Sequence, residues 1–203
     1  MRVLITSGPT AVAIDDVRFI TNAAKGEIGA LFADYFLKKQ AGVFLLSSSV
    51  DKLKGLGCCV EAFCFFQELE DKLKKAIGQG PWDLVVHSAA VSDFAPEKTV
   101  MGKISSDGPL TLRLKPLPKL IGLINESQNV RQIVAFKLEP DLGAAVKQAM
   151  NMFEKYDKIK FIVANSTNPY KAKVCYRNGA MSTLFTDKQS VARYLVDVIM
   201  EGL

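Results

Sequence analysis

Short apolar runs alternate along the chain with segments of helical periodicity. Several runs have the length and the continuous apolar character of strands buried in a parallel sheet: residues 3–5, 41–46, 58–66, 82–88, 132–138 and 161–164. Apolar positions spaced three and four residues apart predict helices in residues 26–36, 67–77 and 142–156, and in a last helix capped by Asp187. This alternation predicts an α/β protein with a Rossmann-like three-layer α/β/α fold and a mostly parallel sheet.

Two segments break the alternation. Residues 103–115 predict two short extended pieces on either side of a Ser-Asp-Gly-Pro turn, and the next helix is expected to begin at Lys119. Near the C-terminus, Asn178 and Gly179 predict a hairpin between residues 173–177 and 180–185. Because no linker or repeat interrupts the pattern, residues 1–203 are expected to form one domain.

Composition excludes several classes of function. The net charge is +5, but the lysines are scattered without a basic run, so a nucleic-acid partner is not expected. The four cysteines form no CxxC pair and there is one histidine, which disfavours a zinc site. Cys58, Cys59 and Cys64 fall in an apolar run and are expected to be buried and reduced. Without a signal peptide or an apolar run of membrane length, the chain is expected to be cytoplasmic and free of membrane.

Small and polar residues follow four of the predicted strands. These strand ends are residues 7–10, 88–93, 137–139 and 165–168. Ligands of open α/β sheets bind at the carboxyl ends of the strands, and a helix that follows offers N–H groups to phosphate. The connection between the first strand and the first helix is also longer than usual, which is typical of a binding loop. The sequence therefore predicts a nucleotide-type site.

Several polar residues near these strand ends have two interpretations. Asn22 is either a helix cap or an amide that binds a carbonyl or carboxylate group. Arg18 is either a surface charge or an anion ligand. Gly26 and Gly29 allow close packing of helix on sheet, and would also let a phosphate approach. Lys103 lies among glycines and serines, as a solvated lysine or as one that closes over a polyphosphate.

The remaining candidates lie on or after the strand that ends at Ser88. Asp93 is either a helix cap or a contact to a ribose, a base or a metal, and it follows Ala89 and Ala90, whose backbone is open to a ligand. His87 lies within an apolar strand and is more typical of a core residue than of a catalyst. Hydrolase chemistry is disfavoured because no nucleophile elbow accompanies this histidine. The GxGxxG fingerprint and the P-loop are absent, which disfavours a routine NAD(P)-dependent oxidoreductase without removing it as an alternative.

The same residues carry a family resemblance. The runs VLITSGPT (3–10) and DDVRFITN (15–22), with Gly26 and Gly29, are similar to the opening of phosphopantothenate–cysteine ligase in its free-standing form. The similarity continues in order through AAVSDF (89–94), KISS (103–106), PKLI (118–121), FKLE (136–139) and VAN (163–165), so it covers nearly the whole chain. The resemblance implies a single nucleotide-binding ligase domain in coenzyme A biosynthesis.

The resemblance also implies roles for individual residues. In the implied reaction 4′-phosphopantothenate attacks CTP or ATP, assisted by Mg²⁺, and L-cysteine then attacks the acyl-nucleotide. Asn22 would hold this intermediate with help from Arg18, and Lys103 would stabilise the triphosphate. The nucleotide site implied by the resemblance comprises Gly8, His87, Ser88, Ala89, Asp93, Lys103, Pro118, Lys119, Leu120, Ile121 and Phe136. The substrate site would include Asn22, Gly26 and Ala90, and no metal ligands are assigned.

The chain also departs from the family pattern. Residues 23–25, Ala-Ala-Lys, replace a serine-containing run, and Lys103 alone replaces a lysine-rich loop. The family's later nucleotide-binding lysines fall at Phe153 and Asp157, and neither Lys155 nor Lys158 is assigned in their place. The resemblance further implies a homodimer with hairpin segments at its interface, and a phosphopantothenoylcysteine decarboxylase on a separate chain. A degenerate protein that binds phosphopantothenate or nucleotide without ligating stays open.

Overall fold

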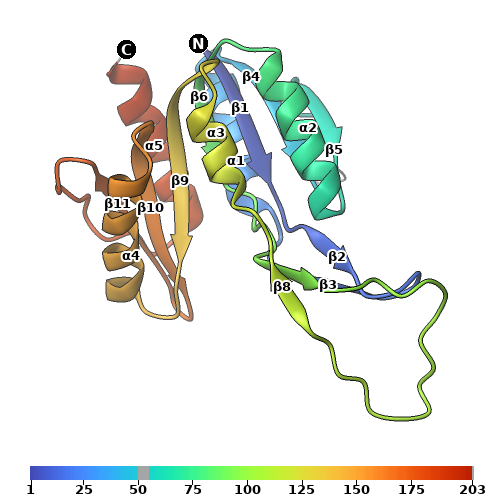
Figure 1. The fold of residues 1–203 in the computed structure, drawn as a ribbon. Coiled ribbons are helices and arrows are strands. Elements are labelled where there is room, and N and C mark those ends of the chain that lie inside the picture. The colour runs from blue at the N-terminus through green and yellow to red at the C-terminus, as the bar shows by residue number, and fades with distance from the viewer. Residues whose placement is uncertain (50–54, 203) are drawn as a thin grey trace.

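The fold is built on one sheet of seven strands (Figure 1). A computed structural model describes residues 1–49 and 55–202. The strand order is β11-β10-β9-β6-β1-β4-β5, and each neighbouring pair is parallel except β10 with β11. The strands are β1 Arg2–Ser7, β4 Gly42–Ser47, β5 Cys59–Ala62, β6 Trp82–His87, β9 Val130–Leu138, β10 Ile159–Thr167 and β11 Tyr170–Tyr176.

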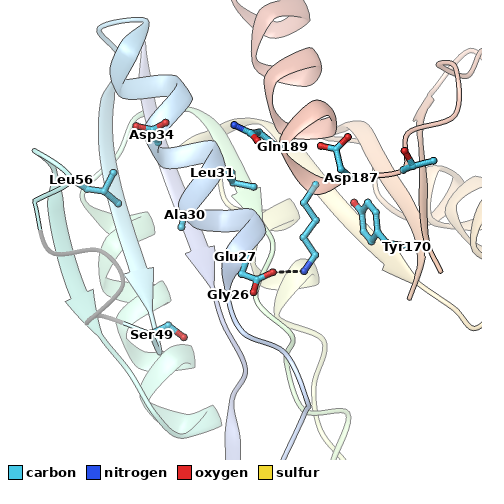
Figure 2. Close-up of a pocket in the computed structure, with 12 residues that line it drawn as sticks. Gly26, Glu27, Ala30, Leu31, Asp34, Ser49, Leu56, Tyr170, Asp187 and Gln189 are labelled. Atoms are coloured by element: carbon cyan, nitrogen blue, oxygen red, sulfur yellow. Dashed lines mark hydrogen bonds and ion pairs between the residues drawn. The ribbon is translucent and has the colours of Figure 1, made fainter. Parts of the chain in front are cut away.

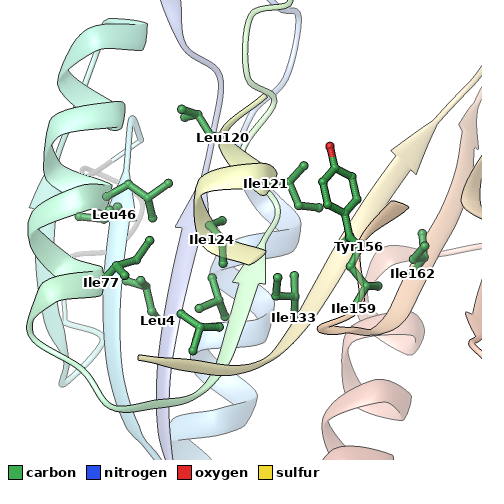
Figure 3. Packing of buried hydrophobic residues seen from close by; sticks show 14 of the residues in the cluster. Leu4, Leu46, Ile77, Leu120, Ile121, Ile124, Ile133, Tyr156, Ile159 and Ile162 are labelled. Atoms are coloured by element: carbon green, nitrogen blue, oxygen red, sulfur yellow. The ribbon is translucent and has the colours of Figure 1, made fainter. Parts of the chain in front are cut away.

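Helices cover both faces of this sheet. Helices α1 (Glu27–Lys38) and α5 (Lys188–Glu201) pack on one face, and α2 (Phe66–Gly78), α3 (Leu120–Glu126) and α4 (Leu142–Lys155) pack on the other. Side chains alternate along a strand, so Val3 and Ile5 of β1 join the α1–α5 core while Leu4 joins the opposite core, shown in Figure 3. The predicted three-layer α/β/α fold is confirmed.

The helix predictions hold closely because each helix buries one apolar stripe. In α2 the stripe predicted from the sequence, Leu69, Leu73, Ala76 and Ile77, is buried. Asp187 caps α5 as predicted, since its side chain accepts a hydrogen bond from the Ser190 amide. Within the described ranges, none of these helices is long and apolar enough to cross a membrane.

The strand predicted over residues 58–66 is wrong in its second half. Strand β5 ends at Ala62, and Phe66 already begins α2. The Glu68 carboxylate accepts hydrogen bonds from the Cys64 and Phe65 amides at 2.7 and 3.3 Å, which turns the chain into the helix. Cys59 and Cys64 are exposed and Cys58 is half-buried, so the expected burial of these three thiols is also wrong.

The extended pair predicted within residues 103–115 does not form. Instead β7 (Phe94–Pro96) pairs antiparallel with β8 (Leu114–Pro116), and the intervening segment 97–113 has no regular structure. The alternating Leu110, Leu112 and Leu114 are exposed, because no second layer covers them. Figure 1 shows this segment extending away from the sheet.

The C-terminal hairpin predicted around Asn178 and Gly179 is present, and a second antiparallel pair that the sequence did not predict precedes it. The antiparallel pair is β10 with β11, and it turns at residues 168–169. The Asn178-Gly179 turn exists, with Gly179 at a φ of 87°. Beyond that turn, residues 180–185 make isolated bridges to β11, Ala172 with Phe185 and Cys175 with Met181.

The long connection between β1 and α1 is folded, which the sequence did not reveal. Strands β2 (Ala11–Ala13) and β3 (Phe19–Thr21) form a small antiparallel sheet. Asp15 is buried in the turn between them. The connection is therefore a hairpin that carries Asn22 at its end.

Candidate functional site

The ends of β1 and β6 are joined to each other beyond the sheet. The Ala90 amide donates to the Gly8 carbonyl at 3.0 Å, and the Thr10 amide donates to the Ala90 carbonyl at 3.2 Å. The Thr10 and Ser92 hydroxyls, both buried, lie 2.9 Å apart. Two of the four strand ends predicted to converge are thus locked together and place Gly8 beside Ala90.

The other two strand ends form a second pair. The Glu139 amide donates to the Asn165 carbonyl at 3.1 Å, which joins the ends of β9 and β10. Lys137 and Glu139 form an ion pair at 2.9 Å, so each of these two charges neutralises the other. Because β9 is the neighbour of β6, all four ends lie along one edge of the sheet.

Asn22 is fixed against the segment that follows β6. Its Nδ2 atom donates to the Ala90 carbonyl at 2.9 Å and to the Val91 carbonyl at 3.3 Å. The residue is exposed, and Gly26 rather than Asn22 is the cap residue of α1. Its side-chain oxygen accepts no hydrogen bond within residues 1–49 and 55–202. An amide held in this way is oriented by the protein and still has an acceptor to offer a ligand.

The start of α1 is pressed against the ends of β1 and β6. Gly26 has a φ of 70°, a conformation that favours glycine, and its carbonyl accepts a hydrogen bond from the Ser7 hydroxyl at 2.8 Å. A Cβ atom on Gly29 would lie 2.5 Å from the Ser7 Cβ and 2.8 Å from the Ser88 Oγ. The helix N-terminus can approach the strand ends this closely because Gly29 has no side chain.

We expect the substitution Gly29→Ala to destabilise the protein. The new methyl group meets the Cβ of the buried Ser7, which cannot rotate away, so overpacking costs about 1–3 kcal/mol. Thermal unfolding followed by circular dichroism should show a melting temperature lower by about 3–10 °C. Gly122→Ala in α3 is the matched control, since nothing lies within 4 Å of its new Cβ. An unchanged melting temperature in Gly29→Ala would contradict this packing.

His87 and its neighbours are engaged with Thr6 of β1. His87 Nδ1 lies 2.9 Å from the Thr6 hydroxyl, and the Ser88 hydroxyl donates to the Thr6 carbonyl at 2.7 Å. The Ala89 amide donates to the Thr6 hydroxyl at 3.3 Å. Burial lowers the pKa of His87 to about 4, so the imidazole is neutral at pH 7. These contacts engage the imidazole within the fold, and His87 as a whole residue is half-buried.

Arg18 binds a partner within the chain. Its Nη1 atom lies 2.9 Å from the Asp15 carboxylate and donates to the Ile104 carbonyl at 3.1 Å. Sequence analysis missed Asp15, although an aspartate that precedes the turn residues of a short hairpin is a recognisable signal. Lys103 is exposed and makes no hydrogen bond or ion pair within the described part of the chain.

The residues assigned to nucleotide binding after β6 are divided between the two faces of the sheet. Asp93 pairs with Lys119, and it lies before β7 rather than at a helix start, so it is not a cap. Leu120 and Ile121 begin α3, and their side chains are buried in the core that α2, α3 and α4 form with the sheet. Phe136 packs on the other side, with its ring 5.9 Å from that of Phe32 in α1. The side chains of Leu120 and Ile121 therefore do not share a pocket with Phe136, and Pro118 is exposed.

An open groove of about 790 Å³ begins at the same helix N-terminus (Figure 2). It runs from Gly26 along α1 to the start of α5, where Lys188 pairs with Glu27 at 2.6 Å. Of its lining residues, sequence analysis had pointed to Gly26 and to the Asp187 cap. Tyr170 and Lys188 gave no signal, because their approach to α1 depends on how α5 packs.

This arrangement favours binding and orientation over acid–base catalysis. Neutral His87 is engaged with Thr6, and the Asp15 carboxylate is consumed by hydrogen bonds. Within residues 1–49 and 55–202, no group of three or more histidine, cysteine or acidic side chains is placed to hold a metal ion. What the edge offers is a fixed amide, a tightly packed helix start and open backbone, while Lys103 lies on the projecting segment that is tied to the β2–β3 turn.

Comparison with known proteins identifies the family. The profile of the DNA/pantothenate metabolism flavoprotein C-terminal domain matches residues 1–203. The chain belongs to this family. Among solved structures of the family fold, the DNA/pantothenate metabolism flavoprotein from Streptococcus pneumoniae superimposes with a TM-score of 0.86 over 100% of both chains, at 23% identity. That likeness confirms the predicted fold.

Curated relatives in this family carry related names. The coenzyme A biosynthesis bifunctional protein CoaBC from Thermococcus kodakarensis is 36% identical over 144 residues, which is 70% of this chain and 35% of that protein. Phosphopantothenate–cysteine ligase 1 from Oryza sativa is 28% identical over 84% of this chain and 70% of its own length. The chain thus spans about a third to a half of the length of the bifunctional relatives that it matches.

Proposed function

We propose that the chain ligates 4′-phosphopantothenate to L-cysteine. Family membership supports this proposal, as does the name of the rice relative. A similar fold, at 22% identity and a TM-score of 0.77, is that of a Cab2 variant solved in complex with phosphopantothenate-cysteine. The observation that carries the proposal is the meeting of the fixed Asn22 amide and the α1 N-terminus with the segment after β6 at one edge of the sheet.

The proposed reaction has two steps. The phosphopantothenate carboxylate attacks the α-phosphorus of a nucleoside triphosphate, which forms an acyl-nucleotide and releases pyrophosphate. The amino group of cysteine then attacks the acyl carbon, forms the amide and releases the nucleoside monophosphate. Both nucleophiles come from substrates, so the protein needs to position them and to neutralise charge. A site with a neutral, engaged histidine suits that chemistry.

The residue roles proposed here come from the family resemblance, and the contacts described above are compatible with them. Asn22 would bind the acyl group of the intermediate, with Gly26 and Ala90 beside it. Lys103 would neutralise the triphosphate, while Asp93, Lys119 and the open backbone at residues 87–89 would bind the nucleotide. Arg18, engaged by Asp15, would support the site rather than meet a substrate anion directly. Leu120 and Ile121 would contribute backbone at the start of α3, because their side chains belong to the core.

The co-substrate is proposed to be CTP or ATP with Mg²⁺. Asp93 and Glu139 are each paired with a lysine, and the described residues form no cluster of acidic side chains that could cage the ion, so the phosphate oxygens of the nucleotide would hold most of it. Magnesium keeps several waters and is held largely by phosphate oxygens in such sites, so a dedicated protein cage is not required. Bound there, the ion would neutralise phosphate charge.

Pyrophosphate release tests the proposed function. Purified protein is given Mg²⁺ and either CTP or ATP, with and without 4′-phosphopantothenate and cysteine. Release that depends on phosphopantothenate, followed by product formation with cysteine, would support the ligase, and the faster nucleotide would identify the preferred base. If neither nucleotide gave pyrophosphate while phosphopantothenate still bound, a degenerate binding protein would replace the ligase proposal.

The chain is also proposed to form a homodimer through its projecting segment. Large apolar side chains are exposed along β7, β8 and the segment between them: Phe94, Val100, Met101, Leu110, Leu112 and Leu114. Apolar side chains gathered on one arm mark an interaction surface. A second copy of the chain is the occupant that the family resemblance implies. A phosphopantothenoylcysteine decarboxylase on a separate chain in the same pathway, and a cytoplasmic location of this protein, stay predictions.

We expect the double substitution Met101→Asp and Leu110→Asp to give a monomer. Met101 is 94% exposed and Leu110 is 51% exposed, so the changes should spare the fold of one chain while charging the proposed interface. Light scattering should report twice the chain mass for the unaltered protein and the chain mass for the variant. Met181→Asp with Leu184→Asp, two exposed apolar residues of the predicted C-terminal hairpin, tests the alternative interface: a variant that stays dimeric places the interface on the projecting segment, and one that becomes monomeric places it on the hairpin. A monomeric unaltered protein would overturn the proposal.

A further inference from the structure

The segment that carries Lys103 is held at both sides of that lysine by the β2–β3 turn. Before it, the Gly102 amide donates to the Asp16 carboxylate at 2.8 Å, and the Asp16 amide donates to the Gly102 carbonyl at 3.2 Å. After it, the Ile104 amide donates to the Asp15 carboxylate at 3.1 Å. The surrounding segment, 97–113, has no regular structure of its own. The position of Lys103 therefore depends on contacts with a distant turn.

Asp15 is the centre of these contacts. One carboxylate oxygen accepts from the Val17 and Arg18 amides at 2.9 and 2.7 Å. The other accepts from Arg18 Nη1 at 2.9 Å and from the Ile104 amide at 3.1 Å. Arg18 Nη1 also donates to the Ile104 carbonyl, so both polar groups of residue 104 are bound. The Asp15 side chain is fully buried in the process.

The contacts keep Asp15 ionised. Burial by itself would raise the pKa of Asp15. The hydrogen bonds from the Val17, Ile104 and Arg18 amides, with the charge of Arg18, outweigh that effect and lower the pKa to about 2. The folded-state pKa lies below the usual aspartate value, so the contribution of Asp15 to stability is complete above that value and is lost only as the pH falls toward 2. The anchor is therefore intact throughout the neutral range.

We propose that Asp15 is a positioning residue that holds Lys103 at the phosphate site. The inference rests on the proposed ligase function, in which Lys103 neutralises the triphosphate. Asp15 touches no substrate in this account; it acts by fixing the peptide after Lys103 and by orienting Arg18 against the same peptide. It also ties the Lys103 segment to the hairpin that ends at Asn22, so the two proposed catalytic side chains share one support.

The test variant is Asp15→Asn. Asparagine has the same shape but one acceptor oxygen, and Asp15 uses both, so one set of contacts must be lost. Asp16→Asn is the matched control next to it: the single bond that the Asp16 side chain accepts, from Gly102, can be kept by an amide oxygen. Arg18→Lys is a second variant that keeps the charge beside Asp15 but cannot bridge to the Ile104 carbonyl in the same way.

Limited trypsin digestion measures the anchor without reference to activity. In Asp15→Asn, cleavage after Lys103, identified by the mass of the fragment ending there, should be at least about tenfold faster than in the unaltered protein and in Asp16→Asn. Arg18→Lys should lie between them. Cleavage at an unchanged rate in both Asp15→Asn and Arg18→Lys would show that Asp15 does not fix this segment, and would overturn the inference.

Pyrophosphate release measures the consequence for the proposed reaction. The kcat of Asp15→Asn should fall about 30- to 100-fold, since a displacement of about 1 Å can cost that much, while KM for phosphopantothenate changes less than about threefold. In a Lys103→Ala background, Asp15→Asn should lower the remaining rate by less than about threefold, because its target is gone. Equal effects in both backgrounds would assign Asp15 a general structural role.

The two measurements separate the possible failures. If the unaltered protein releases no pyrophosphate, the proposed function fails while trypsin digestion still tests the anchor. If the unaltered protein is active and Asp15→Asn matches it in kcat, the proposed function stands and the positioning role is overturned. If Asp15→Asn does not fold, Arg18→Lys decides the question with the same digestion and rate measurements.

Discussion

Replacing Lys103 with alanine is expected to lower pyrophosphate release at least about 100-fold. Lys103 makes no ion pair within the described residues, and its neighbours at 102 and 104 are anchored, so its charge is available at a fixed place. Removing one positioned group that stabilises developing charge costs about 10²–10³ in rate. The measurement is release from the unaltered and variant proteins with phosphopantothenate, Mg²⁺ and saturating nucleotide, without cysteine.

Lys98→Ala is the control for Lys103→Ala. Lys98 is an exposed lysine of the same irregular segment. Its substitution by alanine therefore removes the same charge from the same region of the surface. Its rate should stay within about twofold of the unaltered protein, and both variants should keep the original melting temperature. A Lys103→Ala protein that released pyrophosphate at half the normal rate or more would remove Lys103 from the activation step.

The substitution Asn22→Ala is expected to separate the two steps of the reaction. Pyrophosphate release in a single turnover should continue, because the triphosphate contacts lie elsewhere. Transfer to cysteine should slow by about 100-fold, since the positioned amide beside the acyl group is lost. Rapid quenching followed by mass spectrometry should then detect an accumulated phosphopantothenoyl-nucleotide. The unaltered protein should show this intermediate only when cysteine is withheld.

Asn129→Ala provides the comparison for Asn22→Ala. Asn129 also donates its side-chain amide to a backbone carbonyl, that of Ile77 at 3.2 Å, but it lies before β9 at the opposite edge of the sheet. Losing such a tether should affect stability alone and leave both steps at their normal rates. Full ligation by Asn22→Ala would show that the acyl group is held by other residues.

The parts of the fold that the sequence predicted are those in which local pattern and packing agree. The strands inside the central sheet contain continuous apolar runs because helices cover both of its faces, and α2 has a single apolar stripe because it covers one face. The alternation of Leu110 and Leu112 failed as a strand signal, because no neighbouring strand pairs with these residues, and β8 begins only at Leu114, which pairs with Pro96. The strand predicted to reach Phe66 ends at Ala62 instead, because the Glu68 carboxylate binds the Cys64 and Phe65 amides at the start of α2.

The candidate site was predictable to the extent that strand ends converge. Parallel topology alone brings Gly8, Ala90 and Asn165 to one edge of the sheet. Gly26 and Gly29 indicate close packing of α1 against the strand ends. The direction of individual side chains could not be predicted from the sequence: Leu120 and Ile121 point into the core. The turn role of Asp15 was readable from the sequence, but its contact with the Ile104 amide, almost ninety residues further along the chain, was not.

The hydrogen bonds that join β1 to β6 beyond the sheet affect the entropy cost of binding a ligand. The Ala90 carbonyl accepts from both Thr10 and Asn22, and Ser92 and Thr10 bind each other in the interior, so this floor is already in its final conformation. A ligand that binds against this floor would order little of it, so the entropy cost of binding there would be small. Substitutions that loosen these hydrogen bonds would weaken binding through that cost, with no contact to the ligand removed.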